Sequence, residues 1–182
     1  MTSGSASPTV TGTVIAVRPR LVQVRVGRRD ITCDVRKGLL QGVRGQRKLI
    51  AVGDRVKLAV GASGRGVLHE LLERRSKISR VGSVRPRREH VIAANVDMMV
   101  AMQAVNLPRF NRRGLDRLLV LGEAGGVCCA VCLNKVDLVE KSAELDPLAT
   151  YRAIGYPVFQ TSAIRGDGLS ELHAFLRGKS SL

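Results

Sequence analysis

The first part of the chain alternates hydrophobic and polar residues in short runs. Between residues 10 and 73, runs such as "RDITCDVRKG" and "VGDRVKLAV" place apolar side chains at every second position. A period of two predicts strands with one buried face, because successive side chains of a strand point to opposite sides. Several such strands separated by glycine-containing turns predict a small β-barrel. The five-stranded oligonucleotide-binding (OB) fold suits the length and charge, and an SH3-like barrel suits the pattern nearly as well.

From residue 91 the pattern changes to continuous apolar runs. "VIAANVDMMVAMQAV" and "VCCAVCL" lack polar alternation, which is typical of strands buried on both faces. Apolar residues at helical spacing lie between and after these runs. They are Leu115, Leu118, Leu119 and Gly122 in one predicted helix, and Leu169, Leu172 and Leu176 in the last. With further elements at "PLATYRAIG" and "YPVFQT", the order β-α-β-α-β-α predicts a parallel sheet with flanking helices.

Residues 1–9, "MTSGSASPT", precede the first predicted strand. They lack the charged and apolar regions of a secretory signal and are interpreted as a disordered tail. No apolar run of the sequence approaches the roughly 18 residues that a membrane span needs. We therefore expect a cytoplasmic protein that does not bind membranes, and we expect it to be monomeric.

The positive charge of the chain is concentrated in its first half. The whole chain has a net charge of +15, and residues 1–90 hold 20 Lys or Arg against 6 acidic residues. The segment 74–90, "RRSKISRVGSVRPRREH", is especially basic and is interpreted as a linker. Such asymmetry favours a nucleic-acid-binding half joined to a half with another function, against the alternative of a merely solvated basic surface.

The aromatic residues are absent from the basic half. All five lie beyond residue 90: Phe110, Tyr151, Tyr156, Phe159 and Phe175. Proteins that bind unpaired bases stack them on aromatic side chains, so this half lacks the usual platform. The composition favours contact with the phosphates of a folded RNA, and residues 10–73 are predicted to be an RNA-binding domain.

Four cysteines raise the question of a metal or redox site. Cys129 and Cys132 form a C-x-x-C pattern within "VCCAVCL", and Cys33 and Cys128 complete the set. A structural zinc site needs four ligands, usually from two such patterns, and the sequence holds one. The histidines have no ligand-like spacing to it, so we interpret these cysteines as buried thiols of a core strand.

A pattern of polar residues follows the second buried strand. Asn134, Lys135 and Asp137 form N-K-x-D directly after "VCCAVCL", and "TSA" follows the next predicted strand. Because ligands of parallel sheets bind beyond the carboxyl ends of the strands, both loops should face one crevice. The Asp137 carboxylate could accept the two adjacent N–H donors of guanine, which adenine lacks. The alternative interpretation is a polar loop that caps a strand.

The remaining polar groups of these loops suit the same base. Asn134 can hydrogen-bond the base edge and tie the two loops together, and the methylene stem of Lys135 can lie along the base. Ser162 and Ala163 form the second loop, where the Ala163 backbone N–H can donate to the guanine oxygen. These groups predict guanine binding by Asn134, Lys135, Asp137 and Ala163.

These features together resemble the ribosome small-subunit-dependent, circularly permuted GTPases of bacteria. The matching stretches include "TGTVIAV", "VGDRV", "LLERRSKISR", "HVIAANVDMMV", "FNRRGLDRLLVLGEAGG", "LNKVDL" and "TSAIRGDGLSEL". The resemblance implies an all-β OB-fold barrel followed by a circularly permuted P-loop GTPase domain, here residues 91–182. It also implies GTP or GDP as ligand, with Asn134, Lys135 and Asp137 binding the base and Ser162 with Ala163 forming the second base-contacting loop. The implied partners are the small ribosomal subunit and its rRNA.

The phosphate loop G-x-x-x-x-G-K-[ST] is absent from the sequence. Gly178, Lys179 and Ser180 match its last three residues, but His173 stands where the first glycine is required. We interpret "LRGKSSL" as the end of a helix and the start of a further strand, with a deletion into the loop as the alternative. By the resemblance, the phosphate and Mg²⁺ residues and a zinc-binding domain would lie beyond Leu182.

The predicted GTPase domain is thus incomplete, and we expect no catalytic residue in these 182 residues and no GTP hydrolysis by them alone. A stand-alone basic RNA-binding module with a vestigial nucleotide fold is the alternative. A chance N-K-x-D in an unrelated nucleotide-binding protein is a further alternative.

Overall fold

The computed structural model describes the chain apart from residues 1–8, 20, 36–38, 40–49, 82–88 and 139–145. The predicted tail therefore lies outside the described residues, except for Thr9. The chain divides into two compact units, residues 1–95 and 96–182. Within the described parts, no helix has the length and apolar character needed to cross a membrane.

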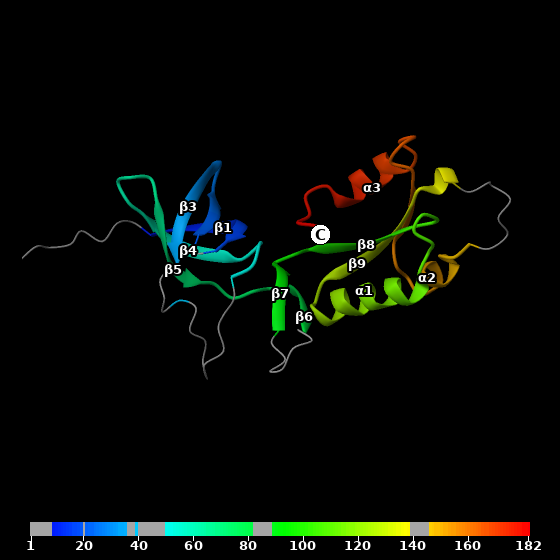
Figure 1. The fold of residues 1–182 in the computed structure, drawn as a ribbon, viewed down its shortest axis with the longest axis horizontal. Coiled ribbons are helices and arrows are strands. Elements are labelled where there is room, and N and C mark those ends of the chain that lie inside the picture. Colours follow the sequence, from blue (N-terminus) through cyan, green and yellow to red (C-terminus); the bar gives the residue numbers. More distant parts are fainter. Residues whose placement is uncertain (1–8, 20, 36–38, 40–49, 82–88, 139–145) are drawn as a thin grey trace, which may run out of the picture. The chain divides into compact units, whose positions relative to one another are not determined.

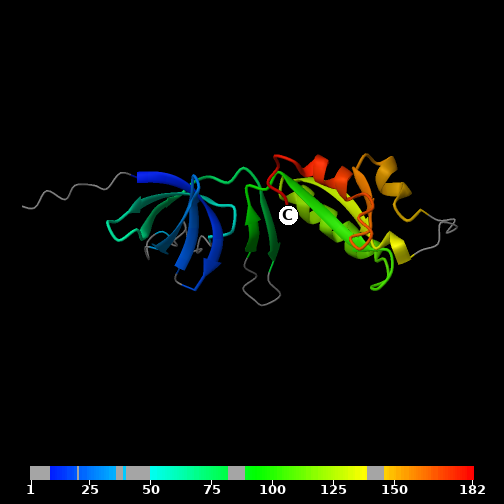
Figure 2. The same cartoon turned by 90° about the horizontal axis from the view of Figure 1, so that it is seen from above.

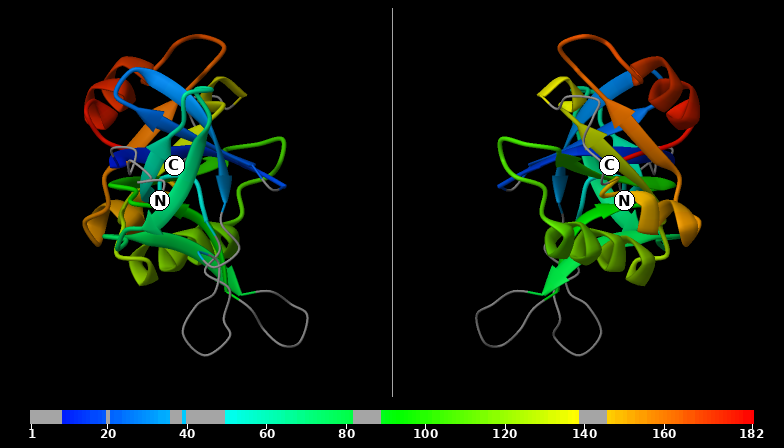
Figure 3. Two further views of the ribbon diagram at one scale, coloured as in Figure 1. Left: turned by 90° about the vertical axis from the view of Figure 1, so that its left-hand side faces the viewer. Right: turned by 90° about the vertical axis from the view of Figure 1, so that its right-hand side faces the viewer.

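The first unit contains a closed barrel of five strands. In chain order they are β1 Thr9–Arg18, β2 Leu21–Val26, β3 Arg29–Val35, β4 Arg55–Val60 and β5 Gly66–Leu71. Their order around the barrel is β1-β2-β3-β5-β4, and β1 pairs with β4 to close it. The β3–β5 pair is parallel and the other four pairs are antiparallel. The predicted barrel is confirmed, and Figure 3 shows how steeply its strands cross.

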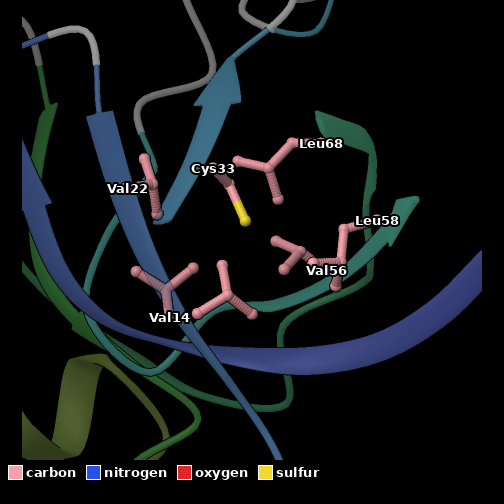
Figure 4. Packing of buried hydrophobic residues seen from close by; sticks show 7 residues of the cluster. Val14, Val22, Cys33, Val56, Leu58 and Leu68 are labelled. Atoms are coloured by element: carbon pink, nitrogen blue, oxygen red, sulfur yellow. The ribbon is translucent and has the colours of Figure 1, made fainter. Parts of the chain in front are cut away.

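The barrel core consists of the inward members of the alternating runs. Figure 4 shows these side chains converging from all five strands. The buried cluster is Val14, Val22, Val24, Cys33, Val56, Leu58 and Leu68. Full burial of each large aliphatic side chain contributes on the order of 1.5–3 kcal/mol. The period-two pattern of the sequence is therefore the pattern that the barrel buries.

The basic segment 74–90 is not simply a linker. Its residues Lys77–Val81 form β6, which pairs antiparallel with β7, Glu89–Ala94, as Figure 2 shows. Ile78 is 1% exposed, and Lys77 forms an ion pair with Glu89 across the two strands at 2.7 Å. The linker interpretation is therefore wrong for β6, because these residues pair with a second strand and bury Ile78.

A buried polar contact fixes the start of β4 to the segment before β6. Asp54 is fully buried and accepts two hydrogen bonds from Arg74, at 2.6 and 2.8 Å, and one from the Ala51 N–H at 2.8 Å. The neighbouring Gly53 has a φ of 89°, and a Cβ there would lie 1.9 Å from the Ala94 carbonyl oxygen. Asn95 accepts from the Arg75 N–H and donates to the Gly53 carbonyl. The "VGDRV" stretch thus joins the barrel to the β6–β7 sheet.

The second unit is a parallel sheet with helices on both faces. Its strands are β8 Met98–Ala104, β9 Cys128–Asn134 and β10 Val158–Thr161, in the order β10-β9-β8. Its helices are α1 Arg112–Ala124, α2 Ala149–Ala153 and α3 Leu169–Leu176. Figure 1 shows α3 on one face of the sheet and α1 and α2 on the other. The predicted β-α-β-α-β-α order is confirmed.

The long apolar run at 91–105 is two strands rather than one. Its first part belongs to β7 and its second part to β8, and the break falls at Asn95, where φ is 54°. Asparagine tolerates this left-handed conformation better than most residues. Hydropathy alone could not locate the break, because both strands are apolar.

The helix α1 packs on one face of the sheet through the predicted stripe. Asn111 caps it by accepting from the Gly114 N–H at 3.0 Å, and Leu115, Leu119 and Gly122 are buried. A Cβ at Gly122 would lie 2.3 Å from the Cys129 sulfur, so glycine allows α1 to approach β9 closely.

The opposite face of the sheet packs against α3. The buried residues are Met98, Ala130, Cys132 and Phe159, with Leu172, Phe175 and Leu176 packed on them. Leu169, predicted on this stripe, is instead 39% exposed. Phe175 completes the stripe, and its ring centroid lies 4.9 Å from that of Phe159.

The cysteines of the C-x-x-C pattern face opposite sides of the sheet. The Cys129 thiol lies against α1, where it donates to the Leu119 and Val127 carbonyls. Cys132 lies on the α3 side, 3.4 Å from the Thr161 hydroxyl. Residues three apart on a strand point in opposite directions, so the two thiols do not converge on one metal ion. The buried-thiol interpretation is confirmed for Cys33, Cys129 and Cys132 and wrong for Cys128, which is exposed.

Residues after α3 extend the sheet beside β8. Ser181 forms a parallel bridge with Met98, and the Val100 N–H donates to the Leu182 carbonyl at 2.8 Å. The interpretation of "LRGKSSL" as a helix end followed by residues of strand character is therefore confirmed.

Candidate functional site

Polar side chains gather where the parallel strands β9 and β10 end. Asn134 is the last residue of β9 and pairs in register with Thr161, the last residue of β10. The short 3₁₀ helix η3, Val136–Leu138, follows Asn134, and the loop to α3 follows Thr161. Figure 1 shows η3 in yellow beside this orange loop. The structure thus brings together the two loops that the sequence predicted to meet.

Asn134 ties the two strand ends to each other. Its side-chain oxygen accepts from the Thr161 hydroxyl at 3.2 Å and from the Ala163 N–H at 3.3 Å. The Ala163 N–H, which the sequence predicted to be a donor to the base, is therefore occupied by Asn134 in this structure. Thr161 was not among the predicted site residues, although its place at the end of a strand was the signal that could have found it.

A second hydrogen bond links Asp137 to the buried Ser162. The Ser162 hydroxyl donates to the Asp137 carboxylate at 2.6 Å and accepts from the Arg165 N–H at 3.2 Å. The Ser162 hydrogen bond is the main reason why the pKa of Asp137 is lowered, and the charges of Arg165 and Lys135 lower it further. Asp137 is therefore held as a carboxylate, with its orientation fixed from the neighbouring loop.

The loop that carries Ser162 is closed by its own backbone. The Ser162 N–H donates to the Asp167 carbonyl at 3.0 Å, and the Gly166 N–H donates to the Ser162 carbonyl at 2.8 Å. Gly168 has a φ of 68°, and a Cβ there would lie 2.1 Å from the Gln160 carbonyl oxygen. The glycine is required both for the backbone conformation and for the close approach to β10.

Lys135 connects the site to the end of the third strand. Its backbone has a φ of 63°, and its ammonium group donates to the carbonyl of Leu107, just beyond β8. The Val105 N–H also donates to the Asn134 carbonyl, at 2.9 Å. Leu107 was not a predicted site residue, since 28 positions separate it from Lys135 and no motif connects them.

The arrangement offers a fixed set of polar groups at the carboxyl edge of the sheet. Asp137 provides an oriented anionic acceptor, Lys135 provides a cation on an apolar stem, and Asn134 provides an amide. Two adjacent N–H donors on a planar ligand would complement the carboxylate through a bidentate contact. The positive φ of Lys135, uncommon for a side chain of this kind, indicates that the surrounding hydrogen bonds hold the loop in this form.

The residues Gly178, Lys179 and Ser180 lie apart from this site. The Lys179 ammonium lies 4.5 Å from the centre of the Phe175 ring. The Ser180 N–H donates to the Asp97 carboxylate at 2.9 Å, and its carbonyl accepts from the Asp97 and Met98 N–H groups. These residues therefore serve helix termination and strand pairing rather than a phosphate-binding turn.

Comparison with known protein families gives one matching family model. The model described as RsgA GTPase matches residues 71–182, which include β6 and the whole parallel-sheet unit.

Individual relatives are proteins named small ribosomal subunit biogenesis GTPase RsgA. The relative from Bacteroides fragilis is 34% identical over 146 residues, covering 79% of this chain and 47% of its own length. The one from Azotobacter vinelandii is 40% identical over 77% of this chain and 41% of its own length. The relative from Pseudomonas syringae is 34% identical, and the match covers 98% of this chain and 51% of that protein. The chain thus spans about half the length of the curated relatives it matches.

Solved structures of other proteins share the fold. One is YloQ, described as a circularly permuted GTPase, with a TM-score of 0.70 and 25% identity. The match covers 100% of this chain and 61% of that one. YjeQ from Thermotoga maritima gives a TM-score of 0.69 and 28% identity, covering 96% of this chain and 59% of that one.

Proposed function

The chain belongs to the RsgA GTPase family, and on that premise we propose that its parallel-sheet unit is the guanine-specifying part of a circularly permuted GTPase. The observation that carries the proposal is the Ser162–Asp137 hydrogen bond of 2.6 Å, which orients a carboxylate at the edge of the sheet. The proposed ligands are GTP and GDP, bound through Asn134, Lys135, Asp137, Ser162 and Ala163.

Guanine recognition follows from the complementarity of Asp137 to the base edge. The carboxylate accepts from the ring N1–H and from the exocyclic amine, which lie side by side on guanine. Adenine has an acceptor at N1 and lacks the amine, so it would give the carboxylate neither of these two donors and would place its own acceptor against it. A missing partner of this kind costs on the order of 1–3 kcal/mol or more, which is the source of the specificity.

Lys135 and Ala163 would shape the pocket around the base. The stem of Lys135 lies along the base plane while its ammonium remains on the Leu107 carbonyl. The Ala163 N–H would exchange its 3.3 Å contact with Asn134 for one with the guanine oxygen. That long contact is weak enough to be replaced without a large loss.

The residues that the structure describes do not fit the Mg²⁺ and zinc ions that the family implies. Lys179 and Ser180, the match to the phosphate loop, are engaged with Phe175 and Asp97. Cys129 and Cys132 face opposite sides of the sheet. We derive no catalytic step through either ion and propose that these 182 residues bind nucleotide without hydrolysing it.

For the first unit we propose an OB-fold domain that binds rRNA of the small ribosomal subunit. The strand order β1-β2-β3-β5-β4 and the net charge of the first half support this assignment. The printed names of the relatives, which refer to biogenesis of the small ribosomal subunit, support the partner. The whole protein would act in the cytoplasm as a monomer during maturation of that subunit.

Nucleotide competition tests the guanine proposal. Fluorescent GDP is bound to the purified chain and displaced by unlabelled GDP, ADP or xanthosine diphosphate. We expect displacement by GDP at least tenfold more effective than by ADP, because only guanine satisfies Asp137. Equal displacement by GDP and ADP would contradict guanine recognition and favour an RNA-binding module with a vestigial nucleotide fold.

A further inference from the structure

The outer surface of the barrel carries a polar hollow over β1. Its volume is about 490 Å³, and it is lined mainly by small residues of β1 together with Arg25 of β2, Gly27 and Arg55 of β4. It lies within the first unit and shares no residue with the proposed guanine site. Nothing in the comparisons assigns a function to it.

The register of the strands places one arginine on each side of Thr13. Thr13 of β1 pairs with Arg25 of β2 on one side and with Arg55 of β4 on the other. Directly opposed residues have Cβ atoms about 4.5–5.5 Å apart, and the three side chains point outward. The Thr13 hydroxyl is therefore flanked in register by one arginine on each neighbouring strand.

The two arginines differ in their charge balance. Arg25 donates to both carboxylate oxygens of Asp30, at 2.8 and 2.9 Å, so its charge is compensated and its guanidinium is held in place. The nearby Lys57 is likewise paired, with Glu70 at 2.8 Å. Among the described residues, Arg55 has no carboxylate partner. Arg55 therefore supplies the uncompensated positive charge of the hollow.

Gly27 lines the hollow without filling it. Gly27 has a φ of 59°, and the position of its absent Cβ meets no atom within 4 Å. Thr11 adds a second exposed hydroxyl on the same face of β1. Hydroxyl and guanidinium donors that line one hollow suit a tetrahedral oxyanion, and arginine binds phosphate through paired N–H groups.

We propose that this hollow binds a backbone phosphate of structured RNA, with Arg55 as its uncompensated charge, Thr13 as the central donor and Arg25, held by Asp30, as the opposite wall. The proposal rests on the RNA-binding function proposed for the barrel, and it assigns that function to a specific face. RNA is the favoured source of the phosphate because residues 1–90 are strongly basic and contain no aromatic residue. Such a surface contacts phosphates rather than stacked bases.

A pair of charge-matched variants tests the proposal. Arg65 lies directly before β5, which is not a neighbour of β1 in the barrel, and it pairs loosely with Asp34 at 3.8 Å. Arg65→Ala removes the same charge as Arg55→Ala from another side of the same barrel. Binding of a labelled RNA duplex to the full chain is measured by fluorescence anisotropy over a series of KCl concentrations.

We expect Arg55→Ala to weaken duplex binding about 5- to 10-fold and Arg65→Ala less than twofold. The slope of log K against log salt should fall by about 0.7–0.9 for Arg55→Ala, as expected for one lost phosphate contact. Equal losses of duplex affinity for the two variants would overturn the proposed phosphate site. They would favour electrostatic attraction spread over the whole basic surface.

A second pair of variants leaves the charge unchanged. Thr13→Val removes the central hydroxyl at nearly constant shape, and Thr9→Val makes the same change on β1 outside the hollow. We expect a loss of about two- to fivefold for Thr13→Val only, since one hydrogen bond is removed. An unchanged affinity for Thr13→Val would remove the threonine from the proposal and overturn it as stated.

Inorganic phosphate separates this proposal from the proposed RNA function. The amide resonances of Thr11 and Thr13 are followed by NMR as phosphate is added to the wild type and to Arg55→Ala. Duplex binding together with shifts that Arg55→Ala abolishes supports the proposal. Duplex binding without such shifts would overturn the phosphate site in the hollow and leave the RNA-binding function of the barrel standing. If the duplex does not bind, the RNA function of the barrel fails, and shifts with phosphate would then indicate a site for free phosphate instead of RNA.

Discussion

At the scale of single residues, a hydrogen bond fixes the orientation of the Asp137 carboxylate in the candidate site. A carboxylate in an N-K-x-D pattern could point anywhere on a loop, but the buried Ser162 hydroxyl fixes one of its oxygens at 2.6 Å. The same hydrogen bond lowers the pKa of Asp137. The carboxylate therefore stays ionised above its ordinary pKa of about 3.9, and loss of nucleotide binding by its protonation is expected only below that value.

The substitution Asp137→Asn should change which base is bound. An amide donates where the carboxylate accepted, so it suits the oxygen that xanthine carries in place of the guanine amine. We expect GDP affinity to fall by about 10- to 100-fold and xanthosine diphosphate affinity to rise, measured by the same displacement assay. Glu123→Gln, near the end of α1, is the matched control and should leave the preference unchanged. An unaltered preference in Asp137→Asn would refute the assignment of this residue to the base.

The cysteines give a prediction that depends only on burial. Burial raises the pKa of the Cys129 thiol to about 11 and raises that of Cys132, and both thiols are enclosed by the sheet and its helices. Cys128, one residue away, is exposed. We expect iodoacetamide at pH 8 to modify Cys128 in the native chain while Cys129 and Cys132 react only after unfolding. Peptide mass spectrometry measures this, and equal labelling of all three would show that the sheet is open.

At the scale of elements, close approaches of backbone decide which residues are permitted. Gly122 allows α1 to lie against Cys129, and Gly168 allows the Ser162 loop to lie against β10. Gly53 does the same for the contact between the start of β4 and the end of β7. In each case a side chain would meet the carbonyl or sulfur of a neighbouring element, so the site loop and the barrel junction depend on glycine in the same way.

Replacement of Gly53 should therefore destabilise the first unit strongly. The residue has a φ of 89°, and the added Cβ of Gly53→Ala would collide with the Ala94 carbonyl oxygen. Strain and overpacking of this kind cost about 3 kcal/mol of unfolding free energy. Urea unfolding followed by circular dichroism measures the loss. Gly61→Ala is the control, because its Cβ would meet its nearest neighbour at an ordinary 3.6 Å. Similar stabilities for the two variants would exclude the collision.

At the scale of the whole molecule, the two units carry different chemistry. The first half holds nearly all of the net charge of +15, whereas the second unit holds the oriented carboxylate and amide of the candidate site. This division supports RNA binding by one unit and nucleotide binding by the other. The family match spans β6 and the second unit, so the RNA proposal depends mainly on charge and on the barrel surface.

The chain of 182 residues should bind GTP without hydrolysing it. Lys179 and Ser180 are engaged in helix termination and strand pairing, so the described residues provide no cradle for the triphosphate. Single-turnover release of labelled phosphate, with and without small ribosomal subunits, measures this. We expect no release above the rate in buffer, and hydrolysis by the purified chain would prove the proposal wrong.

The sequence by itself determined the two architectures and the meeting of two loops. Alternation fixed which faces of β1 to β5 are buried, and the order of apolar strands and helices fixed a parallel sheet, because period and order are local properties. The rule that parallel strands end at one edge was enough to bring Asn134 and Asp137 near Ser162.

Only the tertiary structure decided what depends on contacts between distant residues. It divided the apolar run at Asn95 and formed β6 within the segment interpreted as a linker. On α3 it packed Phe175, and not Leu169, against the sheet. It also brought Leu107 to Lys135 and placed Thr13 between Arg25 and Arg55. These facts depend on strand register, on a left-handed backbone residue and on approaches between elements, and none of them leaves a periodic signal in the chain.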